Sequence, residues 1–301
     1  MKKNYPRNMI GYGSKTPVIK WPNDAKLALQ IVLNYEEGSE NCVLHGDKNS
    51  ETFLSEIIGA QPIKGRHINM ESIYEFGSRR GFWRLHELFQ ERKIPITIFG
   101  AGMALERNRD VCNAMKEADY EIASHGWRWI DYQNISKAKE KKHMELAIQS
   151  IKKIFGHRPL GWYTGRCSPN TRNLVIEDGG FLYDSDSYSD DLPYWDIRNK
   201  KKQLIIPYTL DNNDMRFATN QGFNSGDQFY TYLKDSFDAL YTEGKTKPKI
   251  MSVGLHCRLI GRAGRIQSLK KFLDYVLEHD DVWICKRVDI AKHWIKNYSN
   301  I

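Results

Sequence analysis

LALQIVLNYEE, residues 27–37, is the most strongly patterned segment of the chain and sets the expectation for its architecture. Leu27–Asn34 is an apolar run of strand length, and such a run predicts a strand that is buried. Glu36 and Glu37 follow it directly. Two adjacent carboxylates repel each other and raise the pKa of at least one of them. We therefore interpret the pair as part of a functional site.

The rest of the chain alternates between short apolar runs and segments with helical spacing. Further strands are predicted at 94–99, 120–124, 160–164, 181–183, 204–209, 250–255 and 282–285. Helices are predicted at 79–92, 103–118, 136–155, 168–178, 226–242, 266–278 and 288–296. This alternation indicates the α/β class, with βαβ units around a parallel sheet. About seven parallel strands favour a (β/α) barrel over an open sheet.

Three segments show little periodicity. Residues 1–25 contain scattered prolines and glycines and predict an irregular N-terminal arm. Residues 38–72 and 184–203 predict loops, and a loop as long as the first is unusual without a function. The Ser168-Pro169 pair predicts an N-cap followed by the first turn of a helix. No change in composition marks a linker, so we predict a single catalytic domain over residues 1–301.

Composition and charge limit the compartment and the partners. Basic and acidic residues alternate despite the net charge of +8, so we expect no nucleic-acid partner. The five cysteines are odd in number and contain no CxxC pair, which indicates a reducing environment. Met1–Gly13 lacks the apolar core of a signal peptide, and no run is long enough to cross a membrane. We expect a cytoplasmic protein with no membrane partner.

A second segment, SHGWRWIDY at residues 124–132, follows the strand predicted at 120–124. It opens with His125. Trp129 stands four residues later, where a metal site would offer a second histidine. A tryptophan cannot bind a metal. We therefore interpret Trp127 and Trp129 as pocket wall or core, and His125 as a polar contact in a site.

Other polar side chains also follow predicted strands. Arg166 comes after 160–164, Asp184 after Tyr183, and His256 after Leu255. The carboxyl ends of parallel barrel strands converge on one face, where active sites are built. We expect these residues to meet Glu36 there, with Asp184 bracing Arg166.

These residues, in this order, resemble the polysaccharide deacetylase (NodB-homology) superfamily and, within it, the metal-independent allantoinases. The similar segments run from about residue 5 to residue 297, and they are NYEEG (34–38), HGD (45–47), YEFGSR (74–79), SHGWRW (124–129), GWYTGR (161–166) and LHCRLIGR (255–262). The resemblance implies a distorted (β/α) barrel of the polysaccharide deacetylase type. It also implies a homo-oligomer, with a tetramer as the usual assembly.

The superfamily pattern implies a metal held by an acidic residue and two histidines. Only Glu37 and His125 match those positions here, because Trp129 replaces the second histidine. Zinc sites take three or four protein ligands, so we expect no metal and no other cofactor. A divalent ion such as zinc, if one were bound, would lie near Glu37 and His125.

The allantoinase resemblance implies hydrolysis of a small cyclic amide, the opening of the hydantoin ring of allantoin to allantoate in purine catabolism. We assign Glu36 as general base, with Glu37 raising its pKa, and His256 as general acid. Arg166 or Arg262 is expected to stabilise the oxyanion or clamp a carbonyl. The remaining substrate contacts are expected from Glu37, His125, Trp127 and Trp129.

Two alternatives remain open. The first is a metal-dependent N-deacetylase of a carbohydrate or cell-wall glycan, with His45 or Asp47 from the long loop as the third ligand. The second is a catalytically inactive barrel that binds a ligand or partner. The presence of Glu36, Arg166 and His256 argues against the second alternative.

Overall fold

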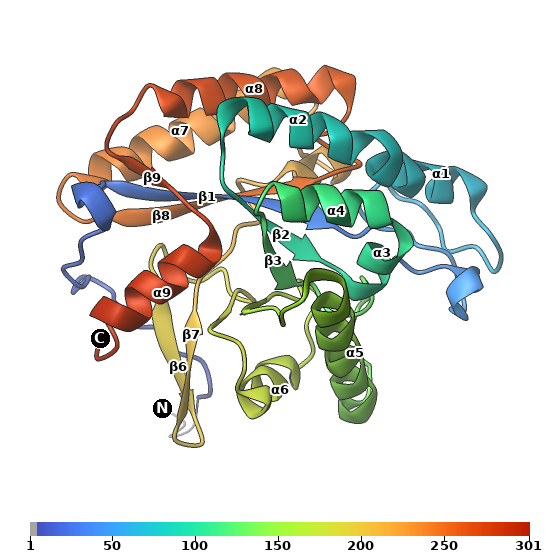
Figure 1. Ribbon diagram of the computed structural model, residues 1–301, viewed down its shortest axis with the longest axis horizontal. Helices are drawn as coiled ribbons and strands as arrows, with labels where there is room; N and C mark the ends of the chain where they lie inside the picture. The colour runs from blue at the N-terminus through green and yellow to red at the C-terminus, as the bar shows by residue number, and fades with distance from the viewer. Residues whose placement is uncertain (1–4) are drawn as a thin grey trace.

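The computed structural model describes residues 5–301. Within them one sheet of nine strands has the order β6-β7-β5-β4-β3-β2-β1-β8, with β9 paired to β1 (Figure 1). The strands are β1 (Leu27–Tyr35), β2 (Ile96–Gly100), β3 (Glu121–Ser124), β4 (Gly161–Trp162), β5 (Tyr183–Asp184), β6 (Tyr194–Arg198), β7 (Lys201–Ile205), β8 (Lys249–His256) and β9 (Val282–Ile284). Every pairing is parallel except that of β6 with β7.

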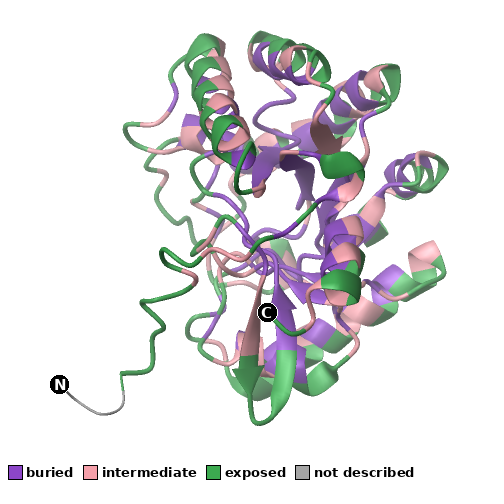
Figure 2. Cartoon of the chain, turned by 90° about the vertical axis from the view of Figure 1, so that its left-hand side faces the viewer, coloured by how far each residue is buried: buried purple, intermediate pink, exposed green. Residues whose placement is uncertain are grey.

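The sheet curls into a half-barrel, which confirms the predicted α/β class and barrel type. Its helices are α1 (Ile68–Phe76), α2 (Phe82–Arg92), α3 (Gly102–Arg107), α4 (Arg109–Glu117), α5 (Lys137–Phe155), α6 (Thr171–Asp178), α7 (Gly226–Gly244), α8 (Ala263–Leu277) and α9 (Arg287–Asn297). Figure 2 shows most of the strands buried in the interior, the end of the β6–β7 hairpin exposed and the outer faces of the helices exposed. At the β8 edge of the sheet, the segment after β7 pairs with β8 at one point, a parallel bridge between Asn213 and Gly254.

β1 is the central strand of the fold. All nine of its residues are buried, and it pairs with β2, β8 and β9. Its register places Asn34 beside His256 and Tyr35 beside Gly100. The carboxyl ends of β1, β2 and β8 therefore lie together, and the residues that follow β1 emerge next to His256.

Alternate residues of β1 face two different cores. Its odd-numbered residues, from Leu27 to Tyr35, pack with α2, α7 and α8, whereas Ala28 and Val32 face the inside of the curled sheet. Successive side chains of a strand point to opposite faces. The same alternation places Glu36 in the cavity inside the curl and Glu37 against the helix side, next to α1. The two carboxylates thus diverge although they are adjacent in sequence.

The helix predicted at 79–92 is longer than expected. α1 continues through a π turn at Gly77–Gly81 into α2, so the predicted loop at 38–72 ends five residues early. A Cβ on Gly81 would lie 2.0 Å from the carbonyl oxygen of Cys257. The glycine lets the helix lie directly against the segment that follows β8. Turns of this kind often occur at functional sites.

Three other predicted boundaries were wrong for local reasons. The helix expected at 103–118 is divided at Asn108, whose side chain accepts a hydrogen bond from the Val111 amide and begins α4. The helix expected from Ser168 begins at Thr171, although the Ser168 hydroxyl accepts a hydrogen bond from the Asn170 amide and donates one to Glu140. Part of the loop expected at 184–203 is the β6–β7 hairpin, whose turn residues have φ of 51° and 63°. That geometry is typical of a tight hairpin turn.

The described part of the N-terminal arm, residues 5–21, contains no helix or strand. A short 3-10 turn follows at Pro22–Asp24. The first four residues of the predicted arm lie outside the described residues. Across residues 5–301, no helix combines the length and the apolar character that a membrane span requires.

Candidate active site

A cavity of about 260 Å³ opens at the carboxyl ends of β1, β3, β4 and β8. It is lined by Asn34, Glu36, Phe53, Leu54, His125, Trp129, Tyr163, Gly165, Arg166, Tyr188, Tyr208, Leu210, Asn213, Met215 and His256. Cavities of about 710 and 880 Å³ lie along the N-terminal arm, but neither is lined by a histidine. A cavity of about 400 Å³ beside α1 is lined by His45 but by neither His125 nor His256. The cavity of about 260 Å³ is the candidate active site, because both His125 and His256 line it together with Glu36.

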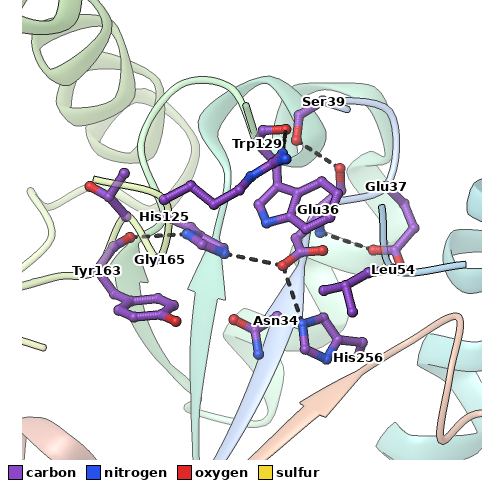
Figure 3. Close-up of polar contacts among 12 residues, drawn as sticks. Asn34, Glu36, Glu37, Ser39, Leu54, His125, Trp129, Tyr163, Gly165 and His256 are labelled. Carbon is purple, nitrogen blue, oxygen red and sulfur yellow. Dashed lines mark hydrogen bonds and ion pairs between the residues drawn. The ribbon is translucent and has the colours of Figure 1, made fainter. Parts of the chain in front are cut away.

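Glu36 is the charged centre of this cavity, with 1% of its surface exposed. Its Oε1 lies 3.1 Å from Nε2 of His125 and 3.5 Å from Nε2 of His256 (Figure 3). Its Oε2 lies 2.7 Å from Nη2 of Arg258. Burial alone would raise the pKa of Glu36. Arg258, His256 and His125 outweigh it, so the pKa of Glu36 lies well below its usual range.

His125 is held between two acceptors. Its Nδ1 lies 3.0 Å from the carbonyl oxygen of Tyr163, and its Nε2 faces Glu36. The backbone is placed by the end of β3, where the His125 amide donates to the Gly100 carbonyl and Gly126 turns away with φ of 74°. Glycine suits that left-handed conformation.

His256, the last residue of β8, is oriented by Asp214. Its Nδ1 lies 2.6 Å from Oδ1 of Asp214, and its amide donates to Oδ2 at 2.7 Å. This leaves Nε2 directed toward Glu36. Burial alone would lower the pKa of His256, but the carboxylates of Glu36 and Asp214 outweigh it and raise the pKa to about 9. His256 is therefore protonated at neutral pH.

The expected effect of Glu37 on Glu36 was wrong in direction. Glu37 lies outside the cavity, with Oε2 accepting a hydrogen bond from the Glu36 amide and its carboxylate against Gly77. Burial raises the pKa of Glu37; Arg258 opposes this, and Glu36 adds to the rise. Glu36 has the lowered pKa, because cationic neighbours surround it. The pKa of Glu37 is therefore raised, in part by Glu36, whereas the pKa of Glu36 in the cavity is lowered.

Arg258 and Asp214 are the charged groups that sequence reasoning missed. Arg258 is fully buried, lies between the carboxylates of Glu36 and Glu37, and is 3.5 Å from Oε1 of Glu37. A cation inside the apolar segment LHCRLI is a signal that could have identified it. Asp214 follows no strand and carries no local signal, because its contact with His256 depends on the tertiary fold.

Arg166 and Trp129 form one wall of the cavity. The Arg166 guanidinium lies 4.2 Å from the centre of the Trp129 ring, and Nη2 donates to the Trp129 carbonyl oxygen at 2.7 Å. The expectation that Asp184 braces Arg166 was wrong. Asp184 pairs with Arg172 at 3.0 Å, and the carboxylate near Arg166 is that of Glu51, at 3.5 Å.

Trp127 and Arg262 do not line the cavity, in contrast to their predicted substrate contacts. Trp127 packs against Gly102, at the start of α3. The Arg262 guanidinium lies over the Phe76 ring, 3.7 Å from its centre, and 3.6 Å from Glu56. Both side chains are used in packing and ion pairing outside the cavity.

The third ligands considered for a metal also lie elsewhere. His45 contacts the Glu40 carbonyl oxygen through Nδ1 at 3.1 Å, and Asp47 pairs with Arg128. Neither residue lines the cavity. No group of three or more histidine, cysteine, aspartate or glutamate residues within 5–301 is arranged to hold a metal ion.

The donor set itself does not fit the metal that the superfamily pattern implies. Trp129 supplies no ligand atom, and the guanidinium of Arg258 lies against both carboxylates that would face such an ion. Glu37 and His125 alone would leave the ion with too few protein ligands. We therefore derive no chemical step through a metal.

Comparisons with known proteins agree with the fold and identify the family. Residues 70–177 match the family described as Polysaccharide deacetylase. A Schizosaccharomyces pombe protein, provisionally named a polysaccharide deacetylase, is 43% identical over 294 residues, which cover 91% of this chain and 92% of that protein.

Two solved structures are similar over nearly the whole chain. One, from Pseudomonas aeruginosa PAO1, is provisionally named a polysaccharide deacetylase, with 58% identity, a TM-score of 0.96 and coverage of 98% of this chain and 99% of that one. The other is the PuuE allantoinase, with 56% identity, a TM-score of 0.97 and coverage of 99% and 100%.

Proposed function

Because the chain belongs to the polysaccharide deacetylase family, we propose that it is a hydrolase of that family which opens the hydantoin ring of allantoin to give allantoate. The observation that carries this proposal is the pair formed by Glu36 and His256, an ionised carboxylate and a protonated imidazole 3.5 Å apart in one small cavity. The 56% identity to a solved allantoinase supports the choice of substrate.

Glu36 is the proposed general base. Ring opening begins when the oxygen of a water molecule bonds to the amide carbonyl carbon and the water loses a proton. Glu36 is ionised, buried and on the cavity surface, so it can take that proton. Its low pKa makes it a weak base but keeps it in the active form. His125 and Arg258 hold its two oxygens in place.

His256 is the proposed general acid. The carbon–nitrogen bond of the ring breaks as the nitrogen receives a proton, and His256 carries one on the Nε2 that faces the cavity. Asp214 fixes the ring and stabilises its charge through Nδ1. The proton taken up by Glu36 can return to His256 across the 3.5 Å between them, which restores the resting state.

Arg166 is the proposed contact for the charge that develops on the carbonyl oxygen. It lines the cavity, and its Nε has no hydrogen-bond partner among residues 5–301. A guanidinium aimed at a developing oxyanion stabilises the transition state more than the ground state. The face of the Trp129 ring contacts the Arg166 guanidinium and holds it in position. No resident metal is part of this mechanism.

The dimensions of the cavity favour a small substrate. A volume of about 260 Å³ is slightly below the range of about 300–1,000 Å³ that is usual for ligand pockets, and aromatic side chains such as Phe53, Trp129 and Tyr188 line it. A hydantoin with one short substituent is compact, whereas a glycan needs a groove that accepts successive sugar units. We therefore rank glycan N-deacetylation below cyclic amide hydrolysis.

The wider context belongs to the same proposal. We propose a single catalytic domain that works in cytoplasmic purine catabolism as a homotetramer. The opening of a purine-derived ring fits such a pathway, and the relatives cover the chain from end to end. Sedimentation analysis of the purified protein tests the assembly, and a mass of four chains is expected.

The substrate is tested by incubating the purified protein separately with allantoin, unsubstituted hydantoin and an N-acetylated chitin oligomer. We expect allantoate from allantoin, slower turnover of hydantoin and no acetate from the oligomer. Release of acetate without ring opening would favour the N-deacetylase. Binding of allantoin without turnover would favour the inactive barrel.

A further inference from the structure

The buried charges behind the cavity form a compact cluster around Arg258. Its guanidinium lies 2.7 Å from Glu36 and 3.5 Å from Glu37, and none of the three side chains has more than 1% of its surface exposed. Buried carboxylates next to a pair of imidazoles are the donors that divalent cations prefer. Two buried carboxylates are stabilised by a nearby positive charge, and here that charge is the Arg258 guanidinium.

The guanidinium is fixed by contacts other than those to the carboxylates. Nε donates to the Leu54 carbonyl oxygen at 2.8 Å. The group lies beside two adjacent aromatic rings, 4.3 Å from the centre of Tyr74 and 4.9 Å from that of Trp129, and the two ring centres are 6.1 Å apart. Such stacking favours a cation that has left water. The side chain is thus held by two neighbouring rings and by the Leu54 carbonyl oxygen.

The contacts with the carboxylates are close but are not aligned hydrogen bonds. Within residues 5–301, neither Nη1 nor Nη2 of Arg258 has a hydrogen-bond partner, and the same holds for Oε2 of Glu36 and Oε1 of Glu37. The contact between the guanidinium and the two carboxylates is therefore one of charge attraction and not of hydrogen-bond direction. Like a metal ion, the guanidinium therefore stabilises the two glutamates through its charge at short distance.

We propose that Arg258 is a built-in cation that occupies the position between Glu36 and Glu37 where a divalent ion would otherwise bind, and that Trp129, whose ring centre lies 4.9 Å from the guanidinium, closes one side of this position. The guanidinium excludes a metal in two ways: it repels a second cation, and it fills the space beside the carboxylates. Arg258 does not line the cavity, so it is a positioning residue that acts through Glu36.

Removing the guanidinium should uncover a metal site. Trp129→His directs an imidazole toward the space of Arg258, because the Trp129 ring already lies against that group. With Arg258→Met added, Glu36, which lies 3.1 Å from Nε2 of His125, would become available to one zinc ion together with His125 and the introduced imidazole. Trp129→His alone is the matched control, since it adds the ligand but keeps the cation.

The experiment is a zinc titration of chelator-treated protein in competition with a chromogenic chelator. The chains compared are the wild type, Trp129→His, and Trp129→His with Arg258→Met. We expect the double variant to bind one zinc per chain at least 100-fold more tightly than Trp129→His, and His125→Ala in that background to weaken binding at least 10-fold. The wild type should show no zinc binding that depends on His125.

Two results would overturn the proposal: His125-dependent zinc binding by a chain that keeps Arg258, or a double variant that binds zinc no more tightly than Trp129→His. Arg258→Lys is a control for misfolding, because it changes the same side chain but keeps a positive charge. A chain with both Arg258→Lys and Trp129→His should still exclude zinc. Zinc binding by that folded variant would also contradict the proposal. The titration uses no substrate, so its outcome is independent of the amide that the protein hydrolyses.

Discussion

At the scale of single residues, the site is defined by two groups whose pKa values move in opposite directions. Glu36 stays ionised because cationic neighbours lower its pKa, and His256 stays protonated because two carboxylates raise its pKa to about 9. A general base must be deprotonated and a general acid protonated for the reaction to proceed. Both conditions hold across neutral pH, so the active form dominates there.

The pH profile of kcat/KM for allantoin should follow from these shifts. His256 is active in its protonated form, which is present below its pKa and lost as pH rises through about 9. Glu36 is active when ionised, and it remains so down to a pH below 4.5, the usual carboxyl value. We expect a plateau between about pH 5.5 and 8 and a fall near pH 9. A fall near pH 7 would contradict this assignment.

Replacing Asp214 should shift the alkaline limb of the same profile. The Asp214 carboxylate raises the pKa of His256, so Asp214→Asn should lower that pKa and move the fall in kcat/KM to lower pH. The loss should therefore be larger at pH 8.5 than at pH 6. Asp211→Asn, which changes an exposed carboxylate on the same segment, is the control and should leave the limb in place.

Sequence alone predicted the residues that follow strands but not their partners. Glu36, His125 and His256 could be placed near one another because parallel strand ends converge. Arg258 and Asp214 could not be assigned, since their contacts join segments that meet only in the folded chain. The direction of the pKa shift of Glu36 depends on those missed neighbours, and for that reason it was predicted wrongly.

At the scale of elements, the π turn between α1 and α2 packs against the buried carboxylate of Glu37, which pairs with Arg258, and against the segment after β8. Gly77 lies against the Glu37 carboxylate, and Gly81 lies against the Cys257 carbonyl. The amphipathic spacing predicted α2, but it could not predict a glycine-lined approach to β8. The hairpin β6–β7 was missed for a related reason, because polar strand residues do not alternate clearly with apolar ones.

Gly81→Ala should test the close approach at the π turn. The new Cβ would lie 2.0 Å from the Cys257 carbonyl oxygen, so either the helix or the segment after His256 must move. We expect a loss of about 1–3 kcal/mol in the free energy of unfolding and reduced kcat. Gly264→Ala in α8, where a Cβ meets nothing within 4 Å, is the control and should be neutral or stabilising. Equal stability of the two variants would exclude the steric role.

At the scale of the whole molecule, β1 joins the two cores and carries the site at its end. Its pairings with β2, β8 and β9 connect the first and last thirds of the chain. This arrangement was predictable in outline, because one strongly apolar run had to be central to an alternating α/β chain. The curl that leaves the sheet a half-barrel was not predictable from periodicity.

Leu33→Ala should weaken the molecule as a whole. Leu33 is fully buried and pairs with Ile98 on one side and Leu255 on the other. Truncation leaves a cavity in the helix-side core and should cost about 2–5 kcal/mol in the free energy of unfolding. Urea unfolding followed by fluorescence and circular dichroism should give coincident single transitions in both proteins. Separate transitions would contradict the single domain.

The central claim is that Glu36 and His256 hydrolyse a cyclic amide with side chains alone. The most direct measurement is kcat/KM for allantoin in protein stripped with a chelator, compared with Glu36→Gln and His256→Ala. We predict an unchanged rate after chelation and a fall of about 10²–10⁴ in each variant. Activity that disappears on chelation and returns with zinc, or near-normal turnover by Glu36→Gln, would contradict the account.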